Sequence, residues 1–433
     1  MAASKSNSLV PVHSFLWLSV LTCLLSLSAS AATLCVNPGG TSGCFASISA
    51  AVSAAGPGDT IQVAPGTYKE DVIIGKSLSL VGAGSSNTII DAMGLSNGIY
   101  VDGIDTPMLK DVVVKGFTVR NANFEGVLVT NASAVTIWGN RILANDKSLD
   151  AAAGTCPGIP AFETLEGFDC GEGVHLSGAD HSSVANNYIA RNGGGILISD
   201  DTAAAHDNLI SGNIAENNPF DCGITLASHP PAELTGTTTP LGVFHNTISN
   251  NDSRRNGLAI EGAGAGVGIF DSVPGTANYG NVVVGNRLIG NGLPGVAMHS
   301  HAPGQNLSDN LIVFNYVAGN GQDTEDAATP GPTGINVFGV SPANGTVISQ
   351  NVIHNEAVDV AVNTSADVEV HLNNFIGHAT GVDNLNSGMV NATENWWGCS
   401  KGPGTNGCAS VGGSGVLTTP WLTMPFVPSN VQH

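Results

Sequence analysis

Short apolar runs alternate with polar positions along most of this chain, and they recur in one frame, apolar-x-x-Asn-x-apolar-x-x-Asn. Copies of this frame start at six positions: Ile137, Val184, Ala205, Val243, Val283 and Ile312. A glycine followed by an apolar-x-apolar triplet often comes next, as in "GILI" from Gly195 and "GVAM" from Gly295. Period-two apolar runs bounded by Gly and Asn are typical of short strands separated by tight turns rather than of helices.

The spacing of the mid-frame asparagines indicates the length of one repeat. Asn187 and Asn208 are 21 residues apart, and so are Asn374 and Asn395. A repeat of this length with three short strands is typical of one coil of a parallel β-solenoid. Because a single coil cannot bury its apolar face, such coils stack on one another. The pattern therefore predicts one elongated all-β domain.

The asparagines themselves are expected to stabilise the coil corners. In a parallel stack the same frame position recurs every ~4.8 Å, so side-chain amides can form hydrogen-bonded ladders. We expect one column from Asn140, Asn187, Asn208, Asn246, Asn286, Asn315 and Asn351. We expect a second from Asn145, Asn192, Asn213, Asn251, Asn291 and Asn320. Asn also tolerates left-handed turn conformations, and neither task is catalytic.

Charge and the N-terminus indicate an exported protein. The chain has 13 Lys and Arg against 34 Asp and Glu, a net charge of −21, which makes nucleic acid and anionic membranes poor partners. Lys5, the apolar run from Phe15 to Leu27 and the small residues before Ala32 are typical of a secretory signal peptide. We therefore expect cleavage after Ala31 and a secreted, extracellular or periplasmic, monomer.

The cysteines fit an oxidising compartment. Cys35/Cys44 and Cys399/Cys408 enclose small Gly-rich loops at the two ends, and we expect both pairs to form disulfides. Of the remaining three, Cys170 and Cys222 would lie two coils apart, ~10 Å by the strand spacing, which is too far for a disulfide. Cys156/Cys170 is the favoured pair, which leaves Cys222 unpaired. A zinc site from these three cysteines has no C-x-x-C motif to support it.

Two segments carry a family resemblance. The segment "SISAAVSAAGPGDTIQVAPGTYKEDVIIGKSLSLVGAG", Ser47–Gly84, resembles the opening of secreted right-handed parallel β-helix proteins of the pectin-lyase-like superfamily. The closing segment "ENWWGCSKGPG", Glu394–Gly404, is similar to the end of many bacterial members. The resemblance implies a single-stranded right-handed parallel β-helix of about 10–12 coils with an N-terminal cap helix over Ala46–Ala55.

Together with the signal-like N-terminus, this resemblance divides the chain into a signal peptide (1–31), an N-terminal cap (32–60), the β-helix (61–398) and a C-terminal cap and tail (399–433). It does not name a reaction. The catalytic segments of pectin methylesterases, polygalacturonases, the commonest pectate lyases and alginate epimerases are absent from the sequence. The superfamily therefore implies carbohydrate as the partner, without an enzyme motif that transfers.

Strand register brings a set of polar residues together. Counted from each leading glycine as zero, positions one and three are apolar and face inward, so positions two, four and six face outward. Position six holds Asp201, His229 and His301 on nearby coils, position four holds His299, and position two holds His175. Asp200 and Asp271 fall at position five, where a bend could turn them outward. Long insertions flank the same face and are expected to wall a cleft.

The chemistry that fits this set is acid–base catalysis on a glycan. Asp201 and Asp271 are two coils apart, roughly the separation expected of the acid and base of an inverting glycosidase. We expect Asp201, Asp271, His229 and His301 to be catalytic and His175, Asp200 and His299 to bind substrate. His229 and His301 are ~10 Å apart, too far to share one metal ion, so no metal site is assigned to these residues.

Three hypotheses for function stay open. The first is a hydrolase, or a lyase, acting on extracellular polysaccharide; the scarcity of basic residues disfavours a polyanionic substrate unless Ca²⁺ bridges it, and no other cofactor is indicated. The second is a non-catalytic extracellular binding or surface protein, with the polar residues merely solvated. The third is a metal accessory role resembling that of copper-accessory β-helix proteins, which the scattered histidines support weakly.

Overall fold

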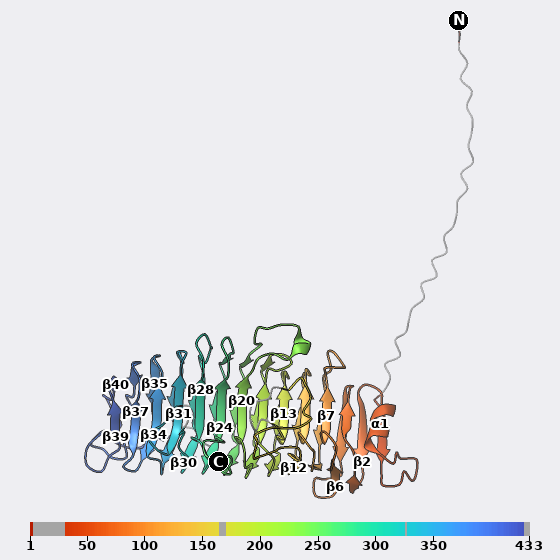
Figure 1. Ribbon diagram of the computed structural model, residues 1–433, viewed down its shortest axis with the longest axis horizontal. Coiled ribbons are helices and arrows are strands. Elements are labelled where there is room, and N and C mark those ends of the chain that lie inside the picture. The colour runs from red at the N-terminus through yellow and green to blue at the C-terminus, as the bar shows by residue number, and fades with distance from the viewer. Residues whose placement is uncertain (3–30, 164–169, 325–326, 428–433) are drawn as a thin grey trace.

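The computed structural model describes residues 1–2, 31–163, 170–324 and 327–427. Within them the strands run side by side along one long axis, with helix α1 (Ile48–Ala54) at one end (Figure 1). Every strand pairing is parallel, and consecutive coils supply consecutive strands of each sheet. This confirms the predicted parallel β-helix. The expected signal peptide lies almost entirely outside the described residues.

Three long sheets and one short sheet form the coil walls. The 14-stranded sheet contains β1 Thr33–Val36, β2 Asp59–Val63, β5 Leu78–Gly82, β8 Val113–Lys115, β11 Thr136–Trp138, β14 Ser183–Ala185, β18 Leu209–Ser211, β22 Thr247–Ser249, β26 Val282–Val284, β29 Leu311–Val313, β32 Val347–Ser349, β35 Val368–His371, β38 Val390–Asn391 and β40 Val416–Leu417. The 11-stranded sheet contains β3 Gly66–Tyr68, β6 Thr88–Asp91, β9 Thr118–Arg120, β12 Arg141–Leu143, β15 Tyr188–Ala190, β19 Ile214–Glu216, β23 Asp252–Arg254, β27 Arg287–Ile289, β30 Tyr316–Ala318, β33 Val352–His354 and β36 Asn374–Ile376.

The glycine-led triplets form the third long sheet, here called the Gly-led sheet. Its 12 strands are β4 Val72–Ile74, β7 Ile99–Asp102, β10 Val127–Thr130, β13 Val174–Ser177, β16 Ile196–Ser199, β20 Ile224–Ser228, β24 Val267–Asp271, β28 Val296–Ser300, β31 Thr333–Gly339, β34 Val358–Asn363, β37 Thr380–Asn384 and β39 Ser410–Gly413. A short sheet of β17 Ala205–His206, β21 Val243–Phe244 and β25 Asn278–Tyr279 lies at one corner. A short 3₁₀ helix, η1, spans Glu233–Thr235.

The core is one continuous apolar column inside the coils. Inward-facing residues such as Ile196, Ile198 and Val267 are at most 1% exposed, and they belong to a single cluster that runs from the N-terminal cap to Trp397. At the N-terminal end, α1 begins after Ser47, whose hydroxyl accepts the Ala50 N–H. The helix covers the first coil, as the resemblance implied, because an open end would expose the column to water.

Asparagine ladders are present at the corners, but their membership differs from the prediction. Asn140 continues through Asn187 to Asn213 and Asn251 rather than to Asn208 and Asn246. Asn208 and Asn246 belong to a third ladder on the coils that carry the short corner sheet. The second ladder continues from Asn192 through Asn218 and Asn256 before it reaches Asn291 and Asn320. Asparagines spaced five residues apart allow neighbouring coils to be aligned in more than one way. The coils that carry the short corner sheet have an additional corner, which shifts their alignment by one asparagine position.

The three predicted disulfides are formed. Cys35–Cys44 and Cys399–Cys408 close loops near the two ends of the solenoid, and Cys156–Cys170 closes the long insertion between β12 and β13. Cys222 is buried and unpaired to another cysteine, as expected. Among the described residues, no helix is long and apolar enough to span a membrane.

Candidate active site

The register predicted from the leading glycines is correct where the candidate residues lie. Ser199 pairs with Ala227, and Ser228 pairs with Asp271 on the next coil. The chain continues past these strands so that His229 lies beside Asp201, with its Nδ1 3.0 Å from the Asp201 Oδ1. Two of the four residues predicted to be catalytic are therefore in direct contact.

A hydrogen-bonded chain extends from this pair along the outer face of the Gly-led sheet. The Ser199 hydroxyl donates to Asp201 Oδ2 at 2.6 Å, and His175 Nε2 lies 2.8 Å from the same hydroxyl oxygen. Since the hydroxyl has only one proton, His175 Nε2 carries the hydrogen of the second bond. Asp201 thus joins His175 and His229, which lie on the coils before and after its own, into one unit.

Two glutamates that the sequence analysis missed complete this unit. Glu163, from the insertion, places Oε2 3.8 Å from His175 Nδ1. Glu125, the residue before a leading glycine, is fully buried beside it. We call Glu125, Glu163, His175, Ser199, Asp201 and His229 the acid–histidine cluster. Register could have indicated Glu125, but Glu163 lies in an insertion, where no repeat fixes its position.

Burial and neighbouring charges separate the carboxyl groups of the cluster into two kinds. Burial would raise the pKa of Asp201, but the charge and hydrogen bond of His229, with His175 and Ser199, lower it to about 2. Burial, then the charge of Asp201, raises the pKa of Glu163 to about 8. Burial and the charge of Glu163 raise the pKa of Glu125 to about 8 as well. At neutral pH the cluster therefore contains an ionised Asp201 next to protonated glutamates.

Glu125, Glu163 and His175 also offer one ligand atom each within 4.8 Å of one another, so this part of the cluster has the spacing of a metal site. The acid–base chemistry considered below uses neither glutamate.

Asp271 lies apart from the acid–histidine cluster, one coil beyond His229. Its side chain is 0% exposed, and neither of its carboxyl oxygens has a hydrogen-bond partner among the described residues. Burial, followed by the charge of Asp200, raises the pKa of Asp271 to about 8. His301 contacts the backbone of Asp271, with its Nδ1 2.7 Å from the carbonyl oxygen. Asp271 is therefore held as a neutral acid at pH 7.

Asp200 is fully buried and has a structural task. Its Oδ1 accepts the His229 N–H at 2.7 Å, and its Oδ2 accepts the N–H groups of Leu241 and Gly242 at 3.1 and 2.5 Å. These bonds fasten the 229–242 loop to the coil. The position differs from the substrate-facing one expected for Asp200, because both of its carboxyl oxygens accept hydrogen bonds from the backbone of this loop.

His299 belongs to a second polar group farther along the same face. Its Nε2 lies 3.1 Å from Asp323 Oδ2 and 3.1 Å from Asn336 Nδ2. The His299 ring is 5.2 Å from the Phe270 ring and 5.6 Å from the His301 ring, measured between centroids. Phe270 and His301 are half-buried, so this group has the accessible edge that the acid–histidine cluster lacks.

Access is the main difference from the expected site. Asp201, His229 and Asp271 are at most 1% exposed, so in this structure they do not line an open cleft. The insertions lie over the face instead of walling it: Phe162 stacks on Tyr100, and the Ala232 N–H donates to the Asp201 carbonyl at 2.7 Å. Their conformation is determined by such contacts and has no periodic signal in the sequence.

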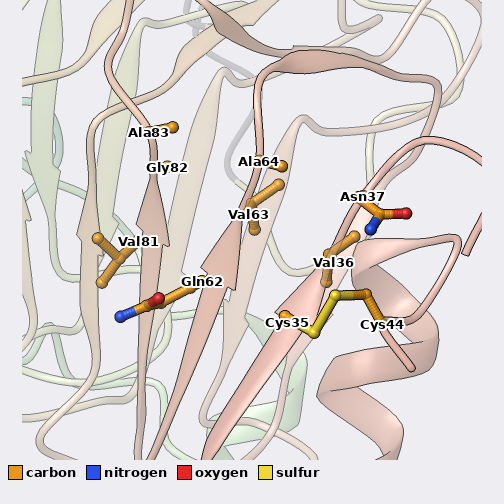
Figure 2. A pocket seen from close by; sticks show the side chains of 10 residues that line it. All are labelled: Cys35, Val36, Asn37, Cys44, Gln62, Val63, Ala64, Val81, Gly82 and Ala83. Carbon is orange, nitrogen blue, oxygen red and sulfur yellow. A yellow bond between two sulfur atoms is a disulfide. The ribbon is translucent and has the colours of Figure 1, made fainter. Parts of the chain in front are cut away.

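A pocket at the N-terminal cap is a separate feature (Figure 2). It adjoins the Cys35–Cys44 disulfide and is lined by small and aliphatic residues together with Asn37 and Gln62. The lining has no titratable side chain, so it offers no acid–base chemistry. The candidate chemistry therefore remains on the Gly-led face.

The fold and this site together define a right-handed parallel β-helix protein with a buried polar cluster on one sheet. Residues 80–273 match the family model described as "Right handed beta helix region". The match supports the right-handed β-helix fold that the resemblance implied. A comparison with proteins that have curated descriptions gave no match.

Three solved structures illustrate the likeness. The catalytic unit of a thermostable GH87 α-1,3-glucanase from Streptomyces thermodiastaticus aligns with a TM-score of 0.53 at 14% identity, over 88% of this chain and 66% of that one. The Dettilon tailspike protein aligns with a TM-score of 0.53 at 12% identity, over 87% and 68%. ORF18 of Geobacillus virus E2 gives 0.52 at 13% identity, over 83% and 62%. At these identities the likeness concerns the fold alone.

Proposed function

We propose that the protein is a secreted, carbohydrate-active β-helix protein that hydrolyses glycosidic bonds in a neutral or weakly acidic extracellular polysaccharide. The observation that carries this proposal is the acid–histidine cluster with its neighbour Asp271. Burying several charged and titratable groups together costs several kcal/mol unless each is paired. A protein that does not use such groups is therefore expected to have apolar side chains in their place. Strongly perturbed pKa values of this kind are typical of functional sites.

The two predicted catalytic aspartates have the protonation states that hydrolysis requires. A glycosidase needs one carboxylic acid to protonate the leaving oxygen and one carboxylate to activate water or attack the sugar. Asp271, with a pKa near 8, serves as the acid, and Asp201, with a pKa near 2, serves as the carboxylate. His229 orients Asp201, and His301 lies next to Asp271 at the more open edge.

The charge of the chain supports the substrate class. With 34 acidic and 13 basic residues, the surface repels a polyanion, whereas a neutral glycan is not repelled. The shared fold with an α-1,3-glucanase catalytic unit is compatible with this choice. His175 and His299 are assigned to sugar binding. Asp200, which holds the 229–242 loop, is not assigned to substrate binding. Three disulfides and the signal-like N-terminus support an extracellular location.

Hydrolysis requires the 229–242 loop or the insertion before β13 to move away from the Gly-led face. The closed arrangement favours a second candidate, a non-catalytic glycan-binding protein that contacts sugars only at the half-buried edge formed by Phe270, His301 and Phe338. The two candidates differ in whether product forms, because a binding protein retains its glycan unchanged.

A polysaccharide panel distinguishes them. Purified full-length mature chain is incubated with neutral and weakly acidic polysaccharides, and reducing ends and bound glycan are both measured. We expect new reducing ends with at least one polysaccharide, and loss of this product in Asp271→Asn with binding retained. Binding without product would support the second candidate, and equal product from Asp271→Asn would overturn the acid assignment.

A further inference from the structure

One corner of the β-helix carries histidine and aspartate on adjacent coils. The sequence contains "ADH" at Ala179–His181 and "AHD" at Ala205–Asp207, and both alanines are buried in the column. Asp180 pairs with His206 across the corner. His181 and Asp207 therefore occupy the same corner position on neighbouring coils, and both have a left-handed backbone, with φ of 48° and 55°.

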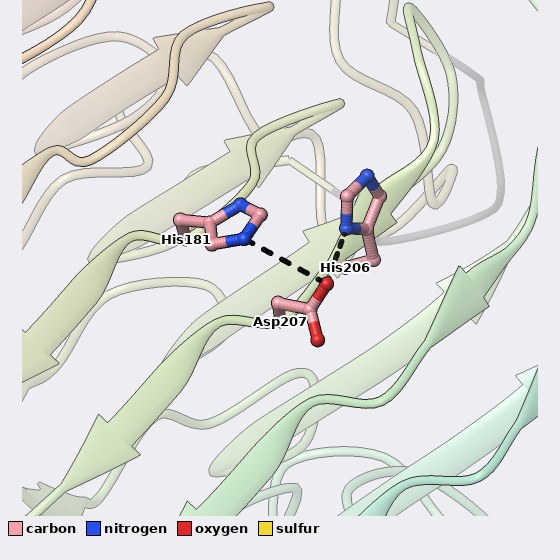
Figure 3. Close-up of side chains that lie close together, drawn as sticks. All are labelled: His181, His206 and Asp207. Atoms are coloured by element: carbon pink, nitrogen blue, oxygen red, sulfur yellow. Dashed lines mark hydrogen bonds and ion pairs between the residues drawn. The ribbon is translucent and has the colours of Figure 1, made fainter.

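Two imidazoles converge on one carboxylate oxygen at this corner (Figure 3). His206 Nδ1 lies 2.8 Å from Asp207 Oδ2, and His181 Nε2 lies 4.0 Å from the same oxygen. The three ligand atoms all lie within 4.8 Å of one another. Ligand atoms around a tetrahedral zinc ion, each at about 2.0–2.2 Å from it, are separated by about 3.3 Å. The group therefore needs only a small rearrangement to bind such an ion.

Neighbouring groups already fix the ligand orientation. Asp180 Oδ1 lies 2.6 Å from His181 Nδ1 and also accepts the Ser133 hydroxyl at 2.7 Å. A carboxylate that takes the Nδ1–H leaves the Nε2 lone pair free for a metal, which is the usual arrangement behind a metal-binding histidine. The His206 ring stacks on Phe244, with centroids 4.9 Å apart and planes 8° apart, so its direction is fixed as well.

The corner is open to solvent. The side chains of His181 and Asp207 are 61% and 44% exposed, so an ion can reach them without any loop movement. Asp180 and His206 also line a shallow surface groove with Asn131 and Gly178. This places the corner outside the closed site described above and makes it independent of the proposed hydrolysis.

We propose that His181, His206 and Asp207 form a surface site for a divalent transition-metal ion, with Asp180 as a positioning residue. Two imidazole nitrogens and one carboxylate oxygen favour Zn²⁺ and its late first-row neighbours over Ca²⁺ and Mg²⁺, which take oxygen ligands. Three protein ligands leave a coordination position for water or for an oxygen of a bound molecule. A plain ion-pair network of the same residues is the competing explanation.

Zinc titration of the metal-stripped full-length mature chain separates the two explanations. We expect one saturable Zn²⁺ site near pH 7 that Ca²⁺ does not displace. His181→Asn and Asp207→Asn keep side chains that tolerate the left-handed backbone, and His206→Phe keeps the stack on Phe244. Each is expected to weaken Zn²⁺ binding at least tenfold, and Asp180→Asn about 10–100-fold.

His245→Asn is the matched control, because His245 occupies the next corner position of the column but is not one of the three ligands. It should bind Zn²⁺ as the wild type does, and all variants should keep the wild-type thermal unfolding midpoint. The proposal is overturned if the wild type shows no saturable site, if His206→Phe binds equally well, or if His245→Asn loses as much affinity as the ligand variants.

Discussion

At the scale of single residues, this fold depends on polar side chains that are fully buried and fully bonded. Asn251 is an example: its Oδ1 accepts the N–H and the side-chain amide of Asn213, while its own amide donates to the Ile210 carbonyl and to Asn286. The carboxyl groups of Asp201 and Asp271 are buried to the same degree with very different pKa values. The first kind stabilises the scaffold, and the second kind carries the proposed chemistry.

Asn251→Ala is expected to destabilise the protein by about 2–4 kcal/mol, because it leaves buried donors on Asn213 and an acceptor on Ile210 without partners. Asn406→Ala, at an exposed position, is the control and should change stability by no more than about 0.5 kcal/mol. Denaturant unfolding measures both. Similar losses of stability in the two variants would show that the asparagine ladder does not stabilise the protein.

The raised pKa of Asp271 also makes the stability of the protein depend on pH. Its folded-state pKa of about 8 lies above the unfolded value of about 3.9, so between these values the folded state holds a proton that the unfolded state has released. Stability is therefore greatest below the unfolded pKa and falls as pH rises toward 8, by up to about 1.4 kcal/mol per pH unit from this group.

Asp271→Asn removes this dependence, so the difference in stability between about pH 5 and about pH 8 should be smaller in the variant than in the wild type. Urea unfolding at the two pH values measures it. An equal or larger difference in the variant would show that Asp271 does not hold the proton.

At the scale of elements, the repeat determines what can be predicted. The Gly-led frame placed Asp201 next to His229 correctly, because strand register follows from the leading glycines. The ladder alignment was wrong at Asn208, because asparagines five residues apart fit two alignments and only the structure shows the extra corner. Glu163 and the closure of the site could not be predicted, since insertions fold by non-repeating contacts.

The Cys156–Cys170 disulfide closes the insertion that carries Glu163. Replacing both cysteines by Ser is expected to leave the β-helix folded but to loosen this insertion, because the coils on either side pair independently of it. Limited proteolysis should then cut within 147–163 at least tenfold faster than in the wild type. Cys399→Ser/Cys408→Ser, at the far end, is the control and should leave cleavage in 147–163 unchanged.

At the scale of the whole molecule, a single stack of coils is closed at both ends. Helix α1 covers the first coil, Trp397 packs on Phe375 in the last coils, and the chain then returns so that Phe426 donates its N–H to Asn374 at 2.8 Å. Such a rod presents a long face on which loops can open or close without disturbing the column. The Gly-led face bears the closed candidate active site, and a separate corner bears the proposed metal site.

The role of Asp201 as the catalytic carboxylate can be measured as product release from Asp201→Asn. On any polysaccharide that the wild type cleaves, we expect at least a hundredfold lower rate of reducing-end formation for Asp201→Asn. Asp309→Asn, at an exposed corner, should retain the full rate. A rate for Asp201→Asn within a few-fold of the wild type, with both variants folded, would exclude Asp201 as the catalytic carboxylate.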